Sequence, residues 1–396
     1  MKYNPLKMPK RTILGPGPSS ANQRVLNAMS LPVVGYLDSA FFDLLDEIIP
    51  MLRHVFKTKQ KVAIVSGAGS AGMEAGFVNL AQKGDKVVIC SYGHFCERQI
   101  MMAERLGLDV IPLRSEWGKS MDPNILQAVL EKNKDVKLVS SIHAETSTGV
   151  LQPVDELAKI SHKFGAFFMT DVVTSLSGSE LYFDDWGIDY AYGGSQKCLA
   201  APPGISPVCI SDHALNYIRN RKILPSSWYF DLSLIIDYWY DKQPHHTAPV
   251  NMVYALREAL SLVMEEGLEN RWERHKNVSA GLRAGLLELG LDLPISPDDR
   301  LDQLTVIKIP DSIDDVDLRN QLIENYSIEV GRGLGEFQGK VIRIGLMGES
   351  CNPSNVFQLL NALEKILPRL GWEVSSGNSL NEASREFNKR SINSNL

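Results

Sequence analysis

One lysine of this 396-residue chain stands where a charged side chain is costly to keep. Lys197 follows a short apolar run that starts at Tyr190, and the turn Pro202-Pro203-Gly204 comes soon after it. Burying an ammonium group in such dry surroundings is unfavourable unless another group compensates the charge. A neutral lysine there is a nucleophile toward carbonyl carbons, whereas a surface lysine that merely follows a strand has no such role. Lys197 is therefore a candidate nucleophile.

A turn of small residues precedes a predicted helix. The predicted strand Lys61–Ser66 leads directly into Gly67-Ala68-Gly69-Ser70-Ala71-Gly72. Small residues let backbone N–H groups approach an anion, and a helix N-terminus adds positive potential. Tight packing alone could also explain the turn, and neither the six-residue dinucleotide motif nor a P-loop lysine is present. The pattern indicates a phosphate site that need not hold a nucleotide.

A carboxylate closes another predicted strand. Asp171 ends the run Ala166–Asp171, where it could be a structural group or a helix cap. It could also hold a proton on a pyridine nitrogen, which would draw electrons from a substrate carbanion in the manner of pyridoxal phosphate. Lys197, Asp171 and the small-residue turn together supply an aldehyde anchor, an electronic partner and a phosphate holder. That combination indicates pyridoxal 5′-phosphate as the cofactor.

The elements that must position these groups follow a regular alternation. From residue 60 to 211, short β-branched runs alternate with helical periods. This predicts an α/β fold with a largely parallel sheet, in which ligands bind beyond the carboxyl ends of the strands. The predicted strands are Lys61–Ser66, Lys86–Ser91, Asp109–Leu113, Val136–Ile142, Ala166–Asp171, Tyr190–Tyr192 and Ser206–Ile210, followed by Leu304–Ile309 and Lys340–Gly345 in a second unit.

Composition excludes several classes of partner and site. The formal net charge is −6 and no basic block is present, which argues against nucleic acid. No apolar run approaches the ~20 residues that cross a bilayer, and the N-terminus lacks a secretory signal, so a cytoplasmic protein without a membrane partner is expected. Five cysteines without a Cys-x-x-Cys pair read as reduced thiols, and no spacing predicts a metal site.

The chain resembles class V pyridoxal-phosphate-dependent aminotransferases, and among them the alanine–glyoxylate, serine–glyoxylate and serine–pyruvate group. The resemblance extends from Leu14 to about residue 370. It rests on several motifs in the same order: Leu14 to Ser19, Ser66 to Ala75, His143 to Gly149, Thr170 to Ser175, Gly194 to Lys197, His245 to Pro249 and Arg343 to Gly348. It implies the aspartate-aminotransferase-like fold (type I), with a large domain around a mostly parallel seven-stranded sheet and a smaller C-terminal α/β domain.

The resemblance assigns roles around the cofactor ring. Lys197 would bind the cofactor covalently and later move the substrate proton, a task that contributes ~10²–10⁴-fold to such rates. Asp171 would pair with the ring nitrogen, and Thr146 would reach the ring hydroxyl. Val173 and Phe95 would pack on opposite faces of the ring, although Phe95 could equally be a plain core residue.

The resemblance also assigns the phosphate and the substrate carboxylate. Four residues would surround the phosphate: Ala68, Gly69, Ser70 and Gln196. Thr247 would reach the phosphate of the neighbouring subunit, which implies a homodimer with shared active sites. Arg343 would grip the α-carboxylate of amino and 2-oxo acids, although a structural Asp or Glu could also neutralise a buried guanidinium.

Four segments are expected along the chain. Residues 1–20 would cross the active site, 21–271 would form the large pyridoxal-phosphate-binding domain, and 272–371 the small C-terminal domain. The tail 372–396 is rich in Ser, Asn and Glu and poor in apolar residues, so disorder is expected there.

The expected activity is transamination from a small amino acid, alanine or serine, to glyoxylate or pyruvate. The alternatives are another class V reaction, of the pyridoxamine–pyruvate transaminase or lyase type, and a non-catalytic subunit that retains the fold. A desulfurase would need a reactive cysteine, for which Cys351 is the one late candidate. Two departures from relatives remain. Pro244 stands where close relatives carry a tyrosine that contacts the phosphate. Arg332 stands where many relatives have glycine, and it is either a solvated loop residue or a second cation for the acceptor pocket.

Overall fold

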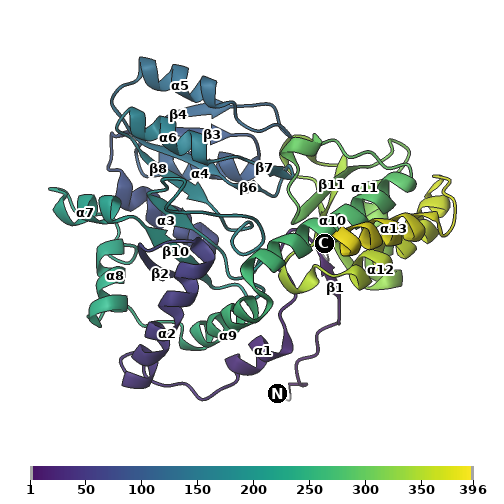
Figure 1. Cartoon of the computed structure of the whole chain (residues 1–396), viewed down its shortest axis with the longest axis horizontal. Coiled ribbons are helices and arrows are strands. Elements are labelled where there is room, and N and C mark those ends of the chain that lie inside the picture. Colours follow the sequence, from purple (N-terminus) through teal and green to yellow (C-terminus); the bar gives the residue numbers. More distant parts are fainter. Residues whose placement is uncertain (1–2, 394–396) are drawn as a thin grey trace.

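A computed structural model describes residues 3–393, which form a large and a small unit around two separate hydrophobic cores (Figure 1). The large unit is built on a seven-stranded sheet of order β2-β10-β9-β8-β5-β3-β4. In this sheet only β10 runs antiparallel to its neighbours, and all the other neighbouring strands are parallel. The prediction of a largely parallel sheet is therefore confirmed. The strands are β2 (Lys61–Ser66), β3 (Lys86–Ser91), β4 (Asp109–Arg114), β5 (Val136–Ile142), β8 (Phe167–Asp171), β9 (Tyr190–Tyr192) and β10 (Ile205–Ile210).

Helices shield this sheet from solvent on both faces. Every residue of β8, β9 and β10 is buried, which requires cover above and below the sheet and explains their nearly continuous apolar sequences. The helices of the large unit are α1 (Gln23–Met29), α2 (Ser39–Phe56), α3 (Gly69–Leu80), α4 (His94–Arg105), α5 (Pro123–Lys132), α6 (Asp155–Lys163), α7 (Asp212–Asn220), α8 (Leu232–Asp241) and α9 (Val250–Glu266). A small hairpin of β6 (Ala144–Glu145) and β7 (Val150–Leu151) follows β5.

The small unit, on the right in Figure 1, has a four-stranded sheet of order β1-β12-β13-β11. The two strands expected here are present as β11 (Leu304–Lys308) and β13 (Val341–Gly345). The sheet also holds β12 (Ile328–Arg332) and β1 (Thr12–Leu14), which were not expected and which pair with each other in parallel. The first strand of the chain is therefore part of the small unit. The helices are α10 (Leu268–Glu288), α11 (Asp315–Tyr326), α12 (Pro353–Ile366) and α13 (Asn378–Asn393).

The expectation of a disordered tail over 372–396 is wrong for the described residues. Helix α13 lies along α10 and α12, with Ala383 fully buried. Its N-terminus is held by the buried Glu364, whose carboxylate accepts hydrogen bonds from the Ser379 hydroxyl at 2.6 Å and from the Gly377 amide at 2.8 Å. Burial of one narrow apolar face thus stabilises a segment whose average composition is polar. Residues 394–396 lie outside the described part of the chain.

The boundary expected between 271 and 272 falls inside α10, which runs from the large unit into the core of the small one. The domain limits therefore stay a prediction. Among the described helices, none combines the length and the apolar character needed to cross a bilayer.

Candidate functional site

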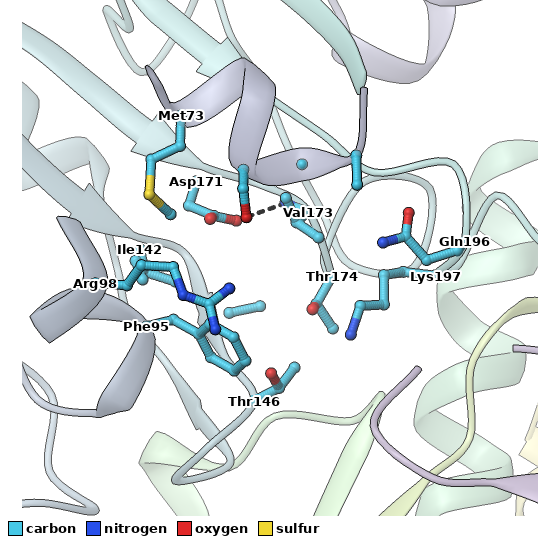
Figure 2. A pocket seen from close by; sticks show the side chains of 14 residues that line it. Met73, Phe95, Arg98, Ile142, Thr146, Asp171, Val173, Thr174, Gln196 and Lys197 are labelled. Carbon is cyan, nitrogen blue, oxygen red and sulfur yellow. Dashed lines mark hydrogen bonds between the residues drawn. The ribbon is translucent and has the colours of Figure 1, made fainter. Parts of the chain in front are cut away.

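A pocket with a cavity of about 140 Å³ opens at the carboxyl end of the large sheet. Figure 2 shows side chains from the start of α3, from α4, from the ends of β5 and β8 and from the loop after β9 converging on it. Nine of the predicted site residues line it: Ala68, Gly69, Ser70, Phe95, Thr146, Asp171, Val173, Gln196 and Lys197. Residues far apart in sequence are thus assembled as the strand-end rule predicts.

The start of α3 forms a cradle of backbone. Ala68 occupies the N-cap position and supplies no side-chain cap, so the first N–H groups of the helix remain available to an anion. Gly69 packs so closely on Val173 that a Cβ at this position would stand 2.5 Å from the valine methyl carbon Cγ2. Beside the cradle, the buried Oε1 of Gln196 has no hydrogen-bond partner among the described residues. An unpaired amide in this place is consistent with a site for a polar ligand.

Lys197 reaches into the pocket from the loop after β9 (Figure 2). Burial lowers the pKa of its amine to about 8, and the positive charge of Arg343 contributes in the same direction. Such an amine is partly neutral near pH 7.5, as a nucleophile or a proton acceptor requires. The Nζ donates a hydrogen bond to the carbonyl oxygen of Pro16.

An N-terminal strap, residues 15–20, crosses over this lysine. The Ser19 hydroxyl donates to the Lys197 carbonyl at 2.7 Å, and the Ser19 amide donates to the Gln196 carbonyl at 2.8 Å. Gly17 has a φ of +119°, and a Cβ there would lie 2.5 Å from Lys197 Nζ. Only glycine therefore lets the strap lie this close to the amine.

Asp171 lies at the tip of β8 and is 6% exposed. Its carboxylate accepts a hydrogen bond of 2.7 Å from the Val173 amide, yet burial dominates and raises the pKa to about 7. The Tyr192 side chain also hydrogen bonds to Asp171, and the Tyr192 oxygen accepts from Gln99 Nε2 at 2.9 Å. Tyr192 and Gln99 thus fix the orientation of Asp171, and sequence reasoning assigned a role to neither.

Phe95 is positioned by a buried carboxylate. Glu145 Oε2 accepts hydrogen bonds from the backbone amides of Phe95 at 3.0 Å and Cys96 at 3.2 Å, which are among the first N–H groups of α4. This arrangement pairs a negative charge with a helix N-terminus and fixes the ring of Phe95 at the pocket wall. The guanidinium carbon of Arg98 lies 4.8 Å from the centre of that ring.

Arg343 on β13 is buried, with 4% of its surface exposed. Its Nε donates to the Arg332 carbonyl at 2.7 Å, and one terminal nitrogen donates to the Thr146 carbonyl at 2.8 Å. No carboxylate of the described residues lies within 4.0 Å of the guanidinium, so the structural Asp or Glu considered above is absent from this part of the chain. Desolvation lowers the pKa of Arg343 to about 10. The charge of the buried Glu145 acts against this lowering, but Glu145 forms no ion pair with Arg343. A buried guanidinium without a directly paired carboxylate among the described residues is suited to a carboxylate ligand.

Arg343 and Thr247 are the predicted site residues that do not line the pocket itself. Arg343 lies near enough for its charge to lower the pKa of Lys197. Thr247 is exposed, next to a pair of histidines in which His245 Nδ1 lies 2.7 Å from His246 Nδ1.

Five lining residues were not singled out from the sequence: Met73, Arg98, Ile142, Ala144 and Thr174. All of these except Arg98 lie within or next to the motifs that carry the family resemblance, so their position in the sequence could have indicated a place in the pocket. Arg98 lies one turn after Phe95 on α4, and helical spacing would have placed it on the same side as that ring. Glu145 also lies within a quoted motif, but only the tertiary structure shows that it caps α4.

Comparison with known proteins gives a consistent result. The family model described as aminotransferase class-V matches residues 36–344. The alanine–glyoxylate aminotransferase of Callithrix jacchus is 39% identical over 369 residues, which cover 92% of this chain and 89% of that protein.

Two solved structures show how far the likeness extends in three dimensions. The ureidoglycine–glyoxylate aminotransferase from Bacillus subtilis superposes with a TM-score of 0.95 at 38% identity, over 97% of this chain and 100% of that one. The pyridoxamine–pyruvate aminotransferase from Mesorhizobium loti superposes with a TM-score of 0.92 at 25% identity, over 98% of this chain and 100% of that one.

Proposed function

This chain belongs to the class V aminotransferase family and is a pyridoxal-phosphate-dependent aminotransferase of fold type I, and we propose that it transfers the amino group of alanine or serine to glyoxylate. Pyruvate is the alternative acceptor, since a pocket discriminates one methyl group by only ~10–200-fold. Support comes from relatives whose names contain glyoxylate. The observation that carries the proposal is the buried Arg343, whose guanidinium donates to two backbone carbonyls and forms no ion pair with any described carboxylate.

The pocket residues fit the cofactor. The backbone at Ala68 and Gly69 and the hydroxyl of Ser70 would hold its phosphate, and the Gln196 amide, which has an unpartnered buried atom, can turn its NH₂ group toward that phosphate. Close packing on Val173 explains why the cradle needs glycine. Thr146 would hydrogen bond to the ring hydroxyl.

The remaining residues would govern the ring and the proton. When bound, the cofactor supplies a protonated ring that withdraws electrons from the substrate α-carbon. Asp171, which burial makes easy to protonate, would be held ionised beside that positive ring nitrogen. Phe95 and Val173 would confine the ring between them. Lys197, once released from the cofactor by the incoming amine, would take the proton from the α-carbon and deliver it to the adjoining atom.

Arg343 would orient the substrate. A planar guanidinium binds a carboxylate through two parallel hydrogen bonds, which fixes the direction of the α-carbon relative to Lys197. A bound carboxylate would also neutralise the charge that lowers the pKa of Lys197. The base would therefore become stronger when a substrate is present.

A second donor, (S)-ureidoglycine, is favoured by one observation. The near-complete superposition with the Bacillus subtilis enzyme is accompanied here by Arg332, an exposed cation on the strand next to Arg343. Its charge adds to the electrostatic field around Arg343. Arg332 would thus be a second cation beside Arg343, and it could bind the additional polar group that (S)-ureidoglycine carries beyond its α-carboxylate.

The rival reactions have less support. A desulfurase would need an accessible thiolate, but Cys351 is 1% exposed and burial raises the pKa of its thiol to about 12. A scaffold that had lost catalysis would not need Lys197, Asp171 and Arg343 to be kept together.

The assembly that we propose is a homodimer with shared active sites. Thr247 is exposed, and near it the ring of His245 packs at a tilt against that of Trp228, with ring centres 4.3 Å apart. Trp228 is 60% exposed and Leu224 is 77% exposed, so a second copy of the chain would cover an apolar surface here. A cytoplasmic location, in keeping with five free thiols, stays a prediction.

Single-turnover spectra test the reaction. The purified protein should be yellow, and alanine, serine or (S)-ureidoglycine alone should convert the absorbance to that of the pyridoxamine form. Glyoxylate or pyruvate should then restore the original spectrum. Arg343→Lys should raise the concentration of each donor that is needed for half conversion. Arg332→Met should raise this concentration for (S)-ureidoglycine only. Absence of any spectral change with all three donors would reject the proposal.

A further inference from the structure

A second cleft, larger than the catalytic pocket, lies between the large and the small unit. It encloses about 570 Å³ and shares no lining residue with the catalytic pocket. Its walls come from the segment after β7, the loop before β9, the first turns of α10 and the segment before β11. We call it the acidic cleft, and its lining includes Asp155, Glu180, Glu269, Glu273, Asp298 and Asp302, with Lys276 as the one cation.

Half of these carboxylates have no counter-charge in the part of the chain that the structure describes. Asp155, Glu269 and Asp302 form ion pairs with cations of the protein. Glu180, Glu273 and Asp298 form no ion pair with any described residue and are exposed to solvent in the cleft. Three unpaired carboxylates against one lysine give the cleft a negative potential, which attracts cations.

Aromatic rings form the floor beside these charges. Tyr182 lies between two indoles, with its ring centre 5.8 Å from that of Trp186 and 5.9 Å from that of Trp272, and both contacts are edge-to-face. Cations are bound by such rings when they approach the ring face within about 6 Å. The protein already uses this recognition at the cleft, since Lys57 Nζ lies 5.7 Å from the Trp272 ring centre and 2.5 Å from a Glu269 oxygen.

One donor in the floor has no acceptor. Trp272 is 8% exposed, and its Nε1 is buried without a hydrogen-bond partner among the described residues. This nitrogen has almost no surface open to the cleft, so Trp272 presents a ligand with its ring and not with its N–H. Lys276, one turn further along α10, offers a positive charge in the same cleft.

We propose that the acidic cleft binds a small guanidino compound that carries a carboxylate or carbonyl oxygen. A guanidinium group stacks on aromatic faces and donates to carboxylates at the same time, which suits a cleft lined by Tyr182, Trp186, Glu273 and Asp298. The oxygen at the other end of the ligand faces the exposed ammonium group of Lys276. The volume is within the range of about 300–1,000 Å³ that small-molecule sites occupy.

Calorimetric titration of the full-length protein with bound cofactor tests this at low ionic strength. Nα-acetylarginine is the probe, because its blocked amine cannot react with the cofactor. Nα-acetylcitrulline is the control, since it has the same shape and carboxylate but an uncharged ureido group in place of the guanidinium. Any binding of the carboxylate to Arg343 would be equal for both. We expect a dissociation constant of about 1 mM or below for acetylarginine and at least about tenfold weaker binding of acetylcitrulline.

The variants locate the site. Replacing two exposed carboxylates by Glu273→Gln and Asp298→Asn together should weaken acetylarginine binding about 3- to 10-fold, as expected for two solvent-exposed ion pairs. Glu324→Gln, an exposed change on α11 outside the cleft, should leave it unchanged. Equal affinities for the two probes, absence of binding, or an unaltered affinity of the double variant would each overturn the proposal. None of these outcomes bears on transamination, which uses other residues.

Discussion

The low pKa of Lys197 leads to a prediction about how fast the cofactor-free protein takes up its cofactor. Only the neutral amine attacks the aldehyde, so the rate of covalent attachment should rise with pH and level off above the pKa. At pH 7.5 an amine with a pKa of about 8 is neutral in about 24% of molecules, against about 0.1% for an ordinary lysine with a pKa of 10.5. The structure therefore predicts attachment about 240-fold faster at this pH than an exposed lysine would allow.

The perturbation is Arg343→Met, which removes a positive charge that lowers this pKa. The midpoint of the pH–rate curve should move upward, because protonating Lys197 then meets less repulsion. We expect a shift of about half a unit or more, equivalent to attachment about threefold slower at pH 7.5. Arg332→Met is the matched control, since Arg332 is exposed and its charge does not contribute appreciably to the Lys197 pKa.

The assay is stopped-flow absorbance of cofactor-free protein mixed with pyridoxal phosphate between pH 6 and 10. A saturating carboxylate without an amine, such as propionate, should raise the midpoint in the wild type by neutralising Arg343, which tests the same charge without a mutation. A wild-type midpoint near 10 would show that burial of Lys197 does not control its proton. An unchanged midpoint in Arg343→Met and with propionate would refute the role of the guanidinium.

Three further predictions concern other parts of the molecule. The hydrogen bond with Asp189 raises the pKa of His162 in the folded protein. The stabilisation of the fold by this pair is therefore present below pH 6.5 and is lost as the pH rises through the folded-state pKa. The melting temperature of His162→Gln should differ from that of the wild type more at pH 5.5 than at pH 8.5, and a constant difference would contradict this. Gly69→Ala should weaken cofactor binding by about tenfold or more, because a Cβ would overlap a valine methyl group. Gly35→Ala, where a Cβ would come no closer than 4.0 Å to Asp38, should have no effect in the same fluorescence titration. Pro244→Tyr should tighten cofactor binding by supplying a phosphate hydroxyl contact, and an equal dissociation constant would show that the hydroxyl is not needed.

The sheet of the large unit was largely predictable from sequence because its strands are buried on both faces. Runs such as Val136–Ile142 need no tertiary information to be recognised, and the seven predicted strands match the observed ones within one residue at each end. The reversed direction of β10 was not predictable in this way, since a fully buried strand has the same apolar pattern in either orientation.

Three elements, β1, β12 and α13, were not predicted from the sequence, because local composition does not reveal them. Strand β1 has only three residues, and its partner β12 lies more than three hundred residues further along the chain, so no local pattern marks either as a pair. The polar composition of α13 predicts disorder, although Leu380, Ala383 and Phe387 recur at helical spacing on one face. Periodicity was the better guide there than the average content of polar residues.

The residues of the candidate site likewise fall into those that the sequence reveals and those that only the fold reveals. Lys197, Asp171 and the turn at Gly69 could be found because each has an unusual residue type at a strand end. Tyr192 and Glu145 could not, because their roles depend on partners that meet only in the folded chain.

The pairing of β1 with β12 has a consequence for how the protein is made. On the ribosome, the segment that covers Lys197 is synthesised first, but the strand that anchors it emerges only after residue 332. The last strand of the large sheet ends at Ile210, so the sheet can fold before that point. Lys197 then stays open to solvent while the chain between residues 210 and 332 is made, and it is covered only afterwards. A nascent or prematurely ended chain would thus expose the reactive amine that the finished enzyme encloses.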